Sequence, residues 1–505
     1  EHHVRPGGPG AGDLMERQIR RLAIGFLVLF GALAVNLNYI QVVAADRIAN
    51  NNANRRLLIQ EYDVDRGDIV AADHRTILAD SEPTGGDLKY QRSYPDDPDL
   101  AYGHLTGYHS FIFGRTELEQ TYNAYLSARA EELFPQRLID EILGRDERGA
   151  GLYLTIDPEL QQIAADGLAG REGAVAALNP QTGEVLALVS NPTFDPNPLA
   201  SHDPDEVRRA YRQLRPRQPD SPLVSRATDT FFPPGSSFKV VTAAAALENG
   251  RGPDFALPNP SSLDLPQTTE NLDNFGGGAC SGGSQIDMAS ALQQSCNVYF
   301  AQLGMEIGAE ALVEQAHRFG FSEDVPFDIP FVESEIPDPD AFELDIPALA
   351  QSAIGQRDVR TNVLHMALVA GAIGNGGRMM VPRLVKEVRD PNGRILRSFG
   401  PEEYGQPMSA ENAGTLTEMM VSVVDAGTAT GAQIPGVRVA GKTGTAQTAE
   451  GEAPHAWFIA FAPAEDPEIA VAVVVLNGGD LGEEATGGAL SAPIARDVME
   501  AALRG

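Results

Sequence analysis

A serine and a lysine three residues apart, Ser236 and Lys239, have the types and spacing of an activated nucleophile. The preceding Pro233-Pro234-Gly235 predicts a turn and residues 238–247 predict a helix, so both side chains would lie on one helix face. A serine hydroxyl is a weak nucleophile until a base removes its proton, and a desolvated lysine can hold a neutral amine for this task. We expect Ser236 to be the nucleophile and Lys239 the base, because Ser237 has the wrong spacing to Lys239.

A second string further along the chain supplies two polar side chains for the same cleft. Ser295 and Asn297 are separated by one residue, so a loop or helix end can direct both side chains at one site while Cys296 points away. We expect Ser295 to relay a proton to a leaving amine and Asn297 to hold a substrate amide. This spacing is common by chance, so its value lies in its position between the other two strings.

A third string, Lys442-Thr443-Gly444-Thr445, follows a short strand-like segment. A glycine at position 444 would let a substrate backbone lie close against an edge strand. We expect Lys442, Thr443 and Thr445 to receive a terminal carboxylate. The backbone N–H groups of Ser236 and Thr445 are the predicted oxyanion hole.

Lysine is scarce in this chain, which makes the ordered set of strings hard to attribute to chance. The chain has only four lysines, and two of them, Lys239 and Lys442, lie in the strings. At this composition a chance S-x-x-K is expected about 0.2 times and a chance K-T-G about 0.02 times per chain. The ordered trio is therefore far stronger than any one member.

Residues 436–443 also satisfy the nucleotide-binding pattern G-x-x-x-x-G-K-[ST]. That function needs a phosphate-cradling loop between the glycines and a helix after the lysine. Here residues 437–440 are strand-like and residues 444–451 are rich in turn formers. We therefore expect no nucleotide site.

The bulk properties exclude several classes of function. The chain has 505 residues, of which 43% are hydrophobic, and is long enough for two or three domains. A net charge of -32, a pI near 4.6 and no Lys/Arg stripe would repel the phosphates of nucleic acids. The nine histidines show neither H-E-x-x-H nor paired Cys/His spacing. We expect a solvated acidic surface, no nucleic acid partner, no metal and no cofactor.

Residues 22–45 predict a transmembrane anchor. They are uncharged and mostly apolar, they are long enough to span a bilayer, and three arginines precede them. The positive-inside rule places residues 1–21 in the cytoplasm and everything after about residue 45 on the outer face of a bacterial membrane. Two alternatives are a signal peptide cleaved near Val43-Ala44-Ala45 and a buried soluble helix.

Export would make the two cysteines, Cys280 and Cys296, partners in an oxidising compartment. A bridge that closes this short loop would stabilise the fold by about 3 kcal/mol in the chain-entropy picture. It would also tie a glycine-rich loop at residues 276–278 to the Ser295 string. The alternative is two buried free thiols.

The rest of the chain divides into segments with different sequence patterns. Residues 1–14 look like artificial leader sequence before a natural start at Met15. Residues 46–150 mix short apolar runs with turn signals, which predicts a small irregular domain without catalytic residues. Residues 151–505 have strand signals near both ends, with helical segments and Pro-rich loops between them. A sheet built from both ends with helices inserted between them is an α+β architecture, and we expect a central antiparallel sheet flanked by helices.

The individual elements of this second part can also be placed. Strands are predicted at residues 174–178, 184–190, 437–439, 455–461 and 469–476, with the first two forming a hairpin. Helices are predicted at residues 157–170, 238–247 and 489–503.

The three strings form the S-x-x-K, S-x-N and K-T-G set of the penicillin-interacting serine acyltransferases. With them, the chain resembles the class B penicillin-binding proteins, in particular the penicillin-binding protein A type. The resemblance covers nearly everything after Met15. It also includes Arg66-Gly67-Asp68-Ile69, Thr155-Ile156-Asp157, residues 179–187, Ile354-Gly355-Gln356, residues 455–463 and Thr486-Gly487-Gly488-Ala489. One departure is Thr116-Glu117-Leu118-Glu119, where many relatives carry Gly-Leu-Glu.

The resemblance implies a membrane anchor, an elongated non-catalytic pedestal and a penicillin-binding transpeptidase domain. It implies D,D-transpeptidase activity, in which a peptidoglycan stem peptide ending in D-Ala-D-Ala acylates Ser236 and releases the terminal D-Ala. An amine of a neighbouring stem peptide then resolves the acyl-enzyme as a cross-link, and β-lactams acylate the same serine. The resemblance also implies a glycan polymerase of the SEDS class as partner and a role in division and cell shape.

Other functions share these residues. A serine β-lactamase or a D,D-carboxypeptidase would use the same chemistry. The anchored pedestal argues against the lactamase, and no obvious glutamate lies beside Ser295-Cys296-Asn297 to activate a deacylating water. The non-enzymatic alternative is a penicillin-binding scaffold that recruits division proteins through residues 46–150 while its active site is idle. The complete trio favours the enzyme.

Overall fold

The computed structural model describes residues 11–43, 62–86, 88–95, 102–447 and 452–504, and the chain separates into two units, residues 1–60 and 61–505. In the first unit, helix α1 (Ala11–Asn38) continues into a π-helical turn, η1 (Tyr39–Val43). The segment Ile19–Gln41 has 23 residues and a mean hydropathy of 1.9, so it is long and apolar enough to cross a bilayer. An apolar helix at this place is confirmed. Residues 1–10 and the candidate cleavage site at Ala44-Ala45 lie outside the described residues.

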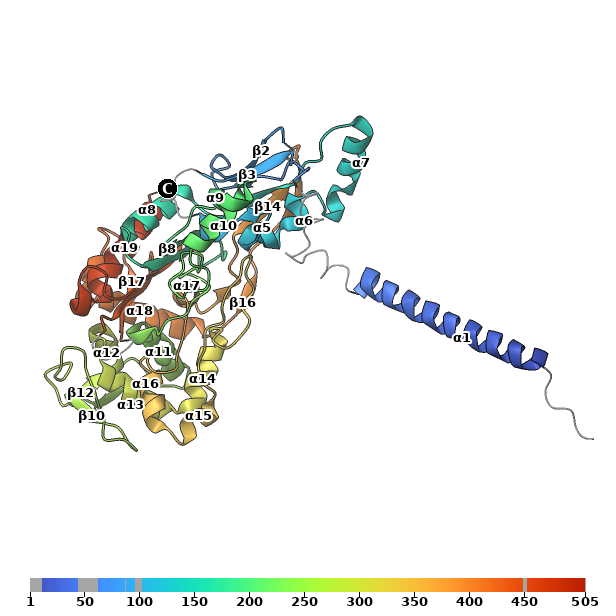
Figure 1. Ribbon diagram of the computed structural model, residues 1–505. Helices are drawn as coiled ribbons and strands as arrows, with labels where there is room; N and C mark the ends of the chain where they lie inside the picture. Colours follow the sequence, from blue (N-terminus) through green and yellow to red (C-terminus); the bar gives the residue numbers. More distant parts are fainter. Residues whose placement is uncertain (1–10, 44–61, 87, 96–101, 448–451, 505) are drawn as a thin grey trace, which may run out of the picture. The chain divides into compact units, whose positions relative to one another are not determined.

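Five strands from the two ends of residues 173–475 form one antiparallel sheet at the centre of the second unit (Figure 1). They are β7 (Gly173–Leu178), β8 (Val185–Asn191), β17 (Ala440–Ala446), β18 (His455–Ala462) and β19 (Ile469–Val475). The order across the sheet is β17-β18-β19-β7-β8, so the last strand in sequence pairs with the first and β17 lies at an edge. Every residue of β7, β18 and β19 is buried, because helices cover both faces. The predicted α+β fold and hairpin are confirmed.

Helices pack on both faces of this sheet. On one face lie α8 (Pro158–Leu168) and α19 (Gly487–Ala502). On the other lies α17 (Val363–Gly374), which is almost wholly buried because α18 (Ala410–Ala426) packs against it. The start of α8 follows the sequence signal, since the Asp157 side chain accepts hydrogen bonds from the N–H groups of Glu159 and Leu160.

The segment between the two halves of the sheet forms a mainly helical lobe, drawn in green, yellow and orange in Figure 1. Its helices are η4 (Gly235–Phe238), α11 (Lys239–Glu248), α12 (Met288–Gln294), α13 (Asn297–Ile307), α14 (Ala309–Arg318), α15 (Pro339–Glu343), α16 (Ile346–Ser352) and, after α18, η5 (Thr430–Ala432). The first two helices after β8, α9 (Asn197–Ala200) and α10 (Pro204–Gln213), lie instead beside the N-terminal part of the unit (Figure 1). The short strands of the lobe pair as β9 (Ala256–Pro258) with β12 (Gln285–Asp287), β10 (Ser262–Asp264) with β11 (Asn271–Asp273), and β13 (Met379–Met380) with β16 (Glu403–Gly405). A last turn, η6 (Gly482–Glu484), precedes α19.

The N-terminal part of this unit is built on a second, mixed sheet. Its strands are β1 (Ile69–Val70), β2 (Ile77–Pro83), β3 (Tyr90–Ser93), β6 (Gly151–Leu154), β14 (Val385–Arg389) and β15 (Ile395–Ser398), in the order β15-β14-β6-β1-β2-β3. Around it lie α4 (Gly103–Thr106), β4 (His109–Ser110), β5 (Gly114–Arg115), α5 (Glu117–Thr121), α6 (Asn123–Leu126), η3 (Glu131–Leu133) and α7 (Phe134–Leu143). Because β14 pairs with β6, the sheet joins segments far apart in sequence. A domain boundary between residues 150 and 151 stays a prediction.

A buried ion cluster holds this N-terminal part together. Arg66 Nε and Arg92 Nε lie 2.5 Å and 2.6 Å from the two carboxylate oxygens of Glu119, and all three side chains are buried. Burial opposes ionisation of Glu119, but the two guanidinium groups outweigh it and lower the pKa of the carboxyl. Arg66, from one of the strings that carry the family resemblance, therefore lies in the core of this part of the protein.

Glu117, the residue that departs from the family pattern, occupies a position suited to glycine. Its φ is 48°, in the left-handed region where a side chain is strained. Burial, followed by the nearby Asp229 carboxylate, raises the pKa of Glu117 to about 8, and its Oε2 is buried without a hydrogen-bond partner within the described part of the chain. A glutamate here therefore costs stability twice, through its backbone and through its carboxylate.

We predict that Glu117→Gly stabilises the protein, and more so at high pH. The folded-state pKa of about 8 lies above the ordinary 4.5, so the carboxyl is harmless below pH 4.5 and increasingly unfavourable as the pH rises to 8. We expect a gain in unfolding free energy of about 2 kcal/mol at pH 5, about half of it from relief of the backbone, and of about 5 kcal/mol at pH 8. Thermal unfolding at both pH values measures it. Glu117→Gln is the matched control, because it keeps the strain and loses the titration; a gain for Glu117→Gly that does not change with pH contradicts the assignment.

Candidate active site

The first string forms a tight 3-10 turn, η4, that leads into α11. Gly235 has φ 53°, and a Cβ there would lie 2.7 Å from the carbonyl oxygen of Thr445, so the turn packs directly against the third string. Ser236 is partly exposed, and within the described residues its hydroxyl has no hydrogen-bond partner. Ser237 is buried and its hydroxyl donates to the carbonyl of Pro234 at 2.7 Å. Of the two serines, only Ser236 offers its oxygen to a ligand.

Lys239 lies at the start of α11 and is fully buried. Its Nζ donates to the backbone carbonyl of Ser295 and to Oδ1 of Asn297, both at 2.7 Å. Burial, and then the positive charge of Lys442, hold the pKa of Lys239 well below its ordinary value, so the neutral amine is favoured. A neutral amine has two N–H groups and one lone pair. The two acceptors take the two N–H groups and leave the lone pair to receive a proton.

The second string links two helices at a sharp corner. Helix α12 ends at Gln294, the next residue, Ser295, has a φ of 61° that reverses the chain, and α13 begins at Asn297. The corner points the Ser295 hydroxyl toward Lys442, whose Nζ donates to it at 2.7 Å. The Asn297 amide is held on both sides, by Lys239 on its oxygen and by the carbonyl of Asp273, which accepts from Nδ2 at 3.0 Å.

The third string lies within the edge strand β17. Lys442 is fully buried, donates to the Thr443 carbonyl at 2.8 Å as well as to Ser295, and burial lowers its pKa to about 7. A Cβ on Gly444 would lie 2.8 Å from the Pro234 carbonyl oxygen, so glycine permits the contact with η4. The sequence placed a strand at 437–439 and a turn after it, but the strand runs over 440–446 and contains the motif.

The same strand excludes the nucleotide-binding reading of residues 436–443. In a P-loop the lysine opens a helix whose N-terminal N–H groups bind phosphate. Here Lys442 is the third residue of β17, and its main chain pairs with Ile459 of β18. No helix N-terminus is therefore present at this string.

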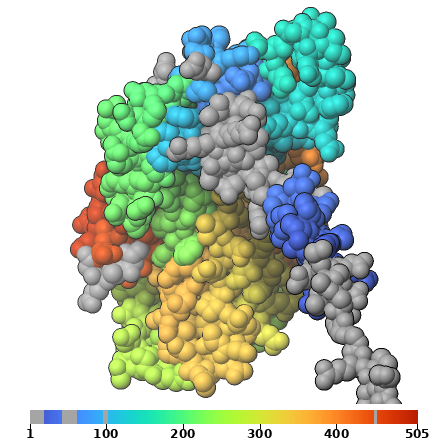
Figure 2. All heavy atoms as spheres, turned by 45° about the vertical axis from the view of Figure 1, so that its right-hand side comes forward, coloured from blue at the N-terminus to red at the C-terminus, as the bar shows by residue number. Residues whose placement is uncertain are grey.

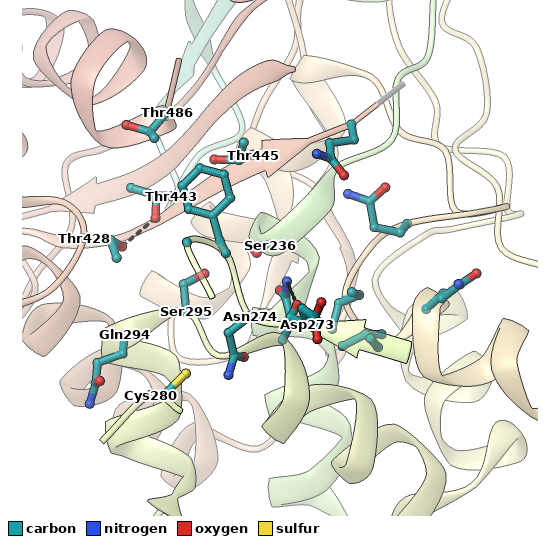
Figure 3. Close-up of a pocket in the computed structure, with 18 of the residues that line it drawn as sticks. Ser236, Asp273, Asn274, Cys280, Gln294, Ser295, Thr428, Thr443, Thr445 and Thr486 are labelled. Carbon is teal, nitrogen blue, oxygen red and sulfur yellow. Dashed lines mark hydrogen bonds between the residues drawn. The ribbon is translucent and has the colours of Figure 1, made fainter. Parts of the chain in front are cut away.

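A cavity of about 900 Å³ opens between the sheet edge and the helical lobe. Figure 3 shows Ser236, Ser295, Thr443 and Thr445 facing one space, with Thr428 bonded to Thr443 through their hydroxyls at 2.6 Å. The predicted site residues that line this cavity are Ser236, Ser295, Asn297, Thr443 and Thr445. The two lysines are buried just beneath it. The three strings therefore converge on one pocket, while the individual catalytic and binding roles stay predictions.

Several residues that line this cavity belong to no motif, so the sequence could not indicate them as site residues. They are Asn271, Asp273, Asn274, Phe275, Gln294, Gln351, Arg357, Thr428 and Gln447. Gln356 and Thr486 also line the cavity and fall in strings that only the resemblance singled out. The string Ile354-Gly355-Gln356 contacts the turn that carries Ser236, because the Gly235 N–H donates a hydrogen bond to the carbonyl of Gly355 at 2.8 Å.

A disulfide joins Cys280 to Cys296, so the predicted pairing is confirmed and the free-thiol alternative is wrong. The Cα atoms are 6.0 Å apart, and the bridge attaches the loop after β11 to the second string. The same loop is also held by Asn274, whose Oδ1 accepts from the Val298 N–H at 3.0 Å. One rim of the cavity is thus fixed to the corner that carries Ser295 and Asn297.

We predict that the double substitution Cys280→Ala, Cys296→Ala destabilises the protein and slows acylation. Loss of the short covalent loop is expected to lower the unfolding free energy by about 3 kcal/mol. Because the rim is released on one side only, the rate of acylation by penicillin G should fall by about tenfold rather than vanish. Thermal unfolding and stopped-flow acylation measure the two effects. Wild-type protein treated with a reductant is the matched control, and an unchanged acylation rate in both would show that the bridge does not position the site.

Comparison with known proteins places this arrangement in a family. The profile described as penicillin binding protein transpeptidase domain matches residues 173–500, and the profile described as penicillin binding protein A dimerisation domain matches residues 66–152. The chain is 41% identical over 498 residues to the peptidoglycan D,D-transpeptidase PbpA of Mycolicibacterium smegmatis, covering 97% of this chain and 99% of the relative. It is 40% identical over 501 residues to PbpA of Mycobacterium tuberculosis, covering 97% and 100%.

Solved structures agree with these matches. The ceftriaxone acyl-enzyme complex of penicillin-binding protein A from M. tuberculosis superposes with a TM-score of 0.84 at 40% identity, covering 88% of this chain and 100% of that one. The penicillin G acyl-enzyme complex of the same protein gives a TM-score of 0.81 at 40% identity, covering 87% and 100%. With three motifs in one pocket and relatives matched over nearly their whole length, the chain belongs to the penicillin-binding protein transpeptidase family.

Proposed function

We propose that the protein is a peptidoglycan D,D-transpeptidase that cross-links stem peptides through an acyl-enzyme on Ser236. The observation that carries this proposal is the environment of Lys239. Its buried amine has two acceptors for its two N–H groups and a lowered pKa, beneath a serine whose hydroxyl is free for a ligand. A serine and a neutral amine in this relation form a nucleophile and its base.

In the first half-reaction, Ser236 Oγ attacks the carbonyl carbon of the penultimate D-Ala while Lys239 Nζ takes its proton. The resulting oxyanion is bound by the backbone N–H groups of Ser236 and Thr445. The C–N bond to the terminal D-Ala then breaks. Ser295, which accepts a hydrogen bond from Lys442, relays the proton held by Lys239 to the leaving amine, so Lys239 is neutral again and the acyl group remains as an ester on Ser236.

In the second half-reaction, an amine of a neighbouring stem peptide attacks the ester carbonyl. It loses a proton to the same base, and Ser236 Oγ leaves and regains its proton. In the first half-reaction, before the C–N bond breaks, Lys442, Thr443 and Thr445 receive the terminal carboxylate of the donor, which then departs with D-Ala, while Asn297 holds the donor amide. β-Lactams present a strained amide and a carboxylate in the same relation, so they acylate the same serine and block the enzyme.

We also propose a place and a partner for this activity. The apolar helix with arginines before it supports a single-pass anchor with a cytoplasmic N-terminus and the enzymatic unit on the outer face. The disulfide supports the outer face, because such bridges persist in oxidising compartments. Family membership supports a SEDS-type glycan polymerase as partner in cell wall synthesis. A reporter enzyme that folds only outside the cytoplasm, fused after residue 504, tests the orientation and should be active.

The activity is tested with the full chain and a thioester mimic of a stem peptide, with and without a D-amino acid as acceptor. We expect release of the thiol, a new amide product when the acceptor is present, and a one-to-one mass increase after penicillin G. Hydrolysed product alone in the presence of acceptor would instead indicate a D,D-carboxypeptidase. Rapid regeneration of unmodified protein after penicillin would indicate a β-lactamase. Neither turnover nor adduct would indicate an idle scaffold.

A further inference from the structure

Contrary to the expectation of no Lys/Arg stripe, a group of arginines gathers on one short helix and the loop after it in this acidic chain. Helix α10 and the loop after it hold five arginines within residues 208–217, in a protein whose net charge is -32. All five are exposed. In Figure 2 the green segment that contains them adjoins the blue segment of the N-terminal part. The site proposed above does not use this surface.

These arginines surround a cavity with an aromatic wall. The cavity has a volume of about 760 Å³ and is lined by Arg208, Arg212, Arg215 and Arg217, with Phe113, Tyr211, Pro216, Gln218 and Asp220. Phe113 and Tyr211 are stacked, with ring centroids 3.8 Å apart and an interplanar angle of 19°. Both rings belong to a small apolar cluster built on Tyr108, Phe194 and Leu199, separate from the main core. The wall is therefore a packed surface with a fixed position.

The positive charge of this cavity is only partly compensated. Asp205 pairs with Arg208 at 3.2 Å and Asp220 pairs with Arg215 at 2.6 Å. Within the described residues, Arg212 and Arg217 have no carboxylate within ion-pair distance. Four guanidinium groups thus face one cavity against a single lining carboxylate. The acidic charge elsewhere on the chain does not cancel this, because charges beyond about 8 Å are screened at physiological salt.

We propose that this cavity, the arginine pocket, binds a phosphate group carried by a molecule with an apolar portion. A planar guanidinium binds a phosphate through two parallel N–H···O bonds, and Arg212 and Arg217 both have these donors available. The cavity already contains one carboxylate, Asp220, which pairs with Arg215. A phosphate or diphosphate with two or three negative charges matches the remaining positive charge better than a second carboxylate would. The stacked rings beside the cations provide the apolar contact.

The arginine pocket is lined by residues from both profile-matched segments of the protein, so a bound ligand would contact both. Phe113 lies in the segment matched by the dimerisation profile, and α10 lies in the segment matched by the transpeptidase profile. A ligand that contacts both rings and guanidinium groups therefore bridges the two segments. Its binding should raise the temperature at which they unfold, by mass action on the folded state.

The test uses the full chain and inorganic pyrophosphate as probe, by isothermal titration and thermal shift. We expect saturable binding at one site, a loss of at least tenfold in affinity for the double variant Arg212→Gln, Arg217→Gln, and less than a twofold change for Arg209→Gln. Arg209 is the matched control, because it is exposed on the same helix and does not line the cavity. The residues are on the surface, so unfolding of each variant without probe should match the wild type.

Two further measurements are needed. One distinguishes a phospholipid from a soluble phosphate compound as the ligand, and the other distinguishes a phosphate from an acidic peptide. Titration of the full chain with a short-chain phosphatidylglycerol below its micelle-forming concentration supports a lipid headgroup if the double variant alone loses binding. Binding of pyrophosphate without binding of this lipid supports a soluble phosphate-bearing molecule. Unsaturable binding, or an equal loss in Arg209→Gln, overturns the proposal. Tighter binding of a glutamate-rich peptide than of pyrophosphate at matched charge also overturns it in favour of an acidic protein partner.

Discussion

Protein with Ser236→Ala is expected to keep its unmodified mass after incubation with penicillin G, whereas wild-type protein gains the mass of one opened β-lactam. The substitution removes a single oxygen, and this oxygen is the atom proposed to form the ester. It leaves the hydrogen bonds of Lys239 to Ser295 and Asn297 unchanged. Thioester turnover should fall below about one-thousandth of the wild-type rate, since the neighbouring Ser237 is bonded to the Pro234 carbonyl and cannot replace the lost nucleophile. Intact-mass spectrometry and thiol release measure both effects.

Ser237→Ala is the matched control for this experiment. Ser237 is the neighbouring serine of the same turn, but its hydroxyl is buried and bonded to the Pro234 carbonyl. We expect this variant to be acylated within a few-fold of the wild-type rate and to lose about 1 kcal/mol of stability with the hydrogen bond. A covalent adduct that persists in Ser236→Ala, or an adduct lost in Ser237→Ala at unchanged thermal stability, would overturn the assignment of the nucleophile.

The convergence of the three strings could be predicted because each string is a local signal. The proline-rich turn before Ser236 and the apolar run after it specify a helix start from neighbouring residues alone, and η4 and α11 follow that signal. The same holds for the hairpin of β7 and β8 and for α8, whose Asp157 cap and Pro158 are adjacent in sequence. In these places the local preference and the final fold agree.

The features that escaped prediction depend on contacts between distant residues. Nothing near Thr428 indicates that its hydroxyl will meet Thr443, and nothing near Asp273 indicates that its carbonyl will hold Asn297. Strand β17 was placed three residues too early because Gly441 and Gly444 are poor strand formers in isolation. They are accepted because β18 pairs along the whole strand and the backbone of η4 lies against Gly444.

The N-terminal part shows the same limit. Residues 385–398 contribute β14 and β15 to a sheet whose other strands lie between residues 69 and 154. Strand pairing over this separation cannot be read from local periodicity, since periodicity indicates only that a strand exists. The change at Glu117 was visible as a departure from the family pattern. Its cost became clear only with its φ and its burial beside Asp229.

Lys239→Met is expected to slow acylation by penicillin G by at least about 10³-fold while penicillin still binds, because it removes the base and keeps the length of the side chain. The variant leaves the Ser295 carbonyl and Asn297 Oδ1 without their donor, so the unfolding free energy should also fall by about 2 kcal/mol. Lys239→Arg separates the two effects. A guanidinium keeps N–H donors but does not give up its proton at any pH of the assay, so this variant should be equally slow if the lysine acts as base.

Lys386→Met is the control for loss of a lysine elsewhere, since its side chain is 49% exposed and pairs with Glu184 on the surface. Its acylation rate should match the wild type.

The pH dependence of the acylation rate is a second measurement, and it would not change if Lys239 had only a structural role. Burial and the nearby charge of Lys442 hold the pKa of Lys239 well below its ordinary value, so the acid limb of the acylation rate should lie at a lower pH than an ordinary lysine would give. If Lys239→Arg is acylated at the wild-type rate with the same acid limb, the proton of Ser236 must go elsewhere, and Ser295 with Lys442 would be the remaining route.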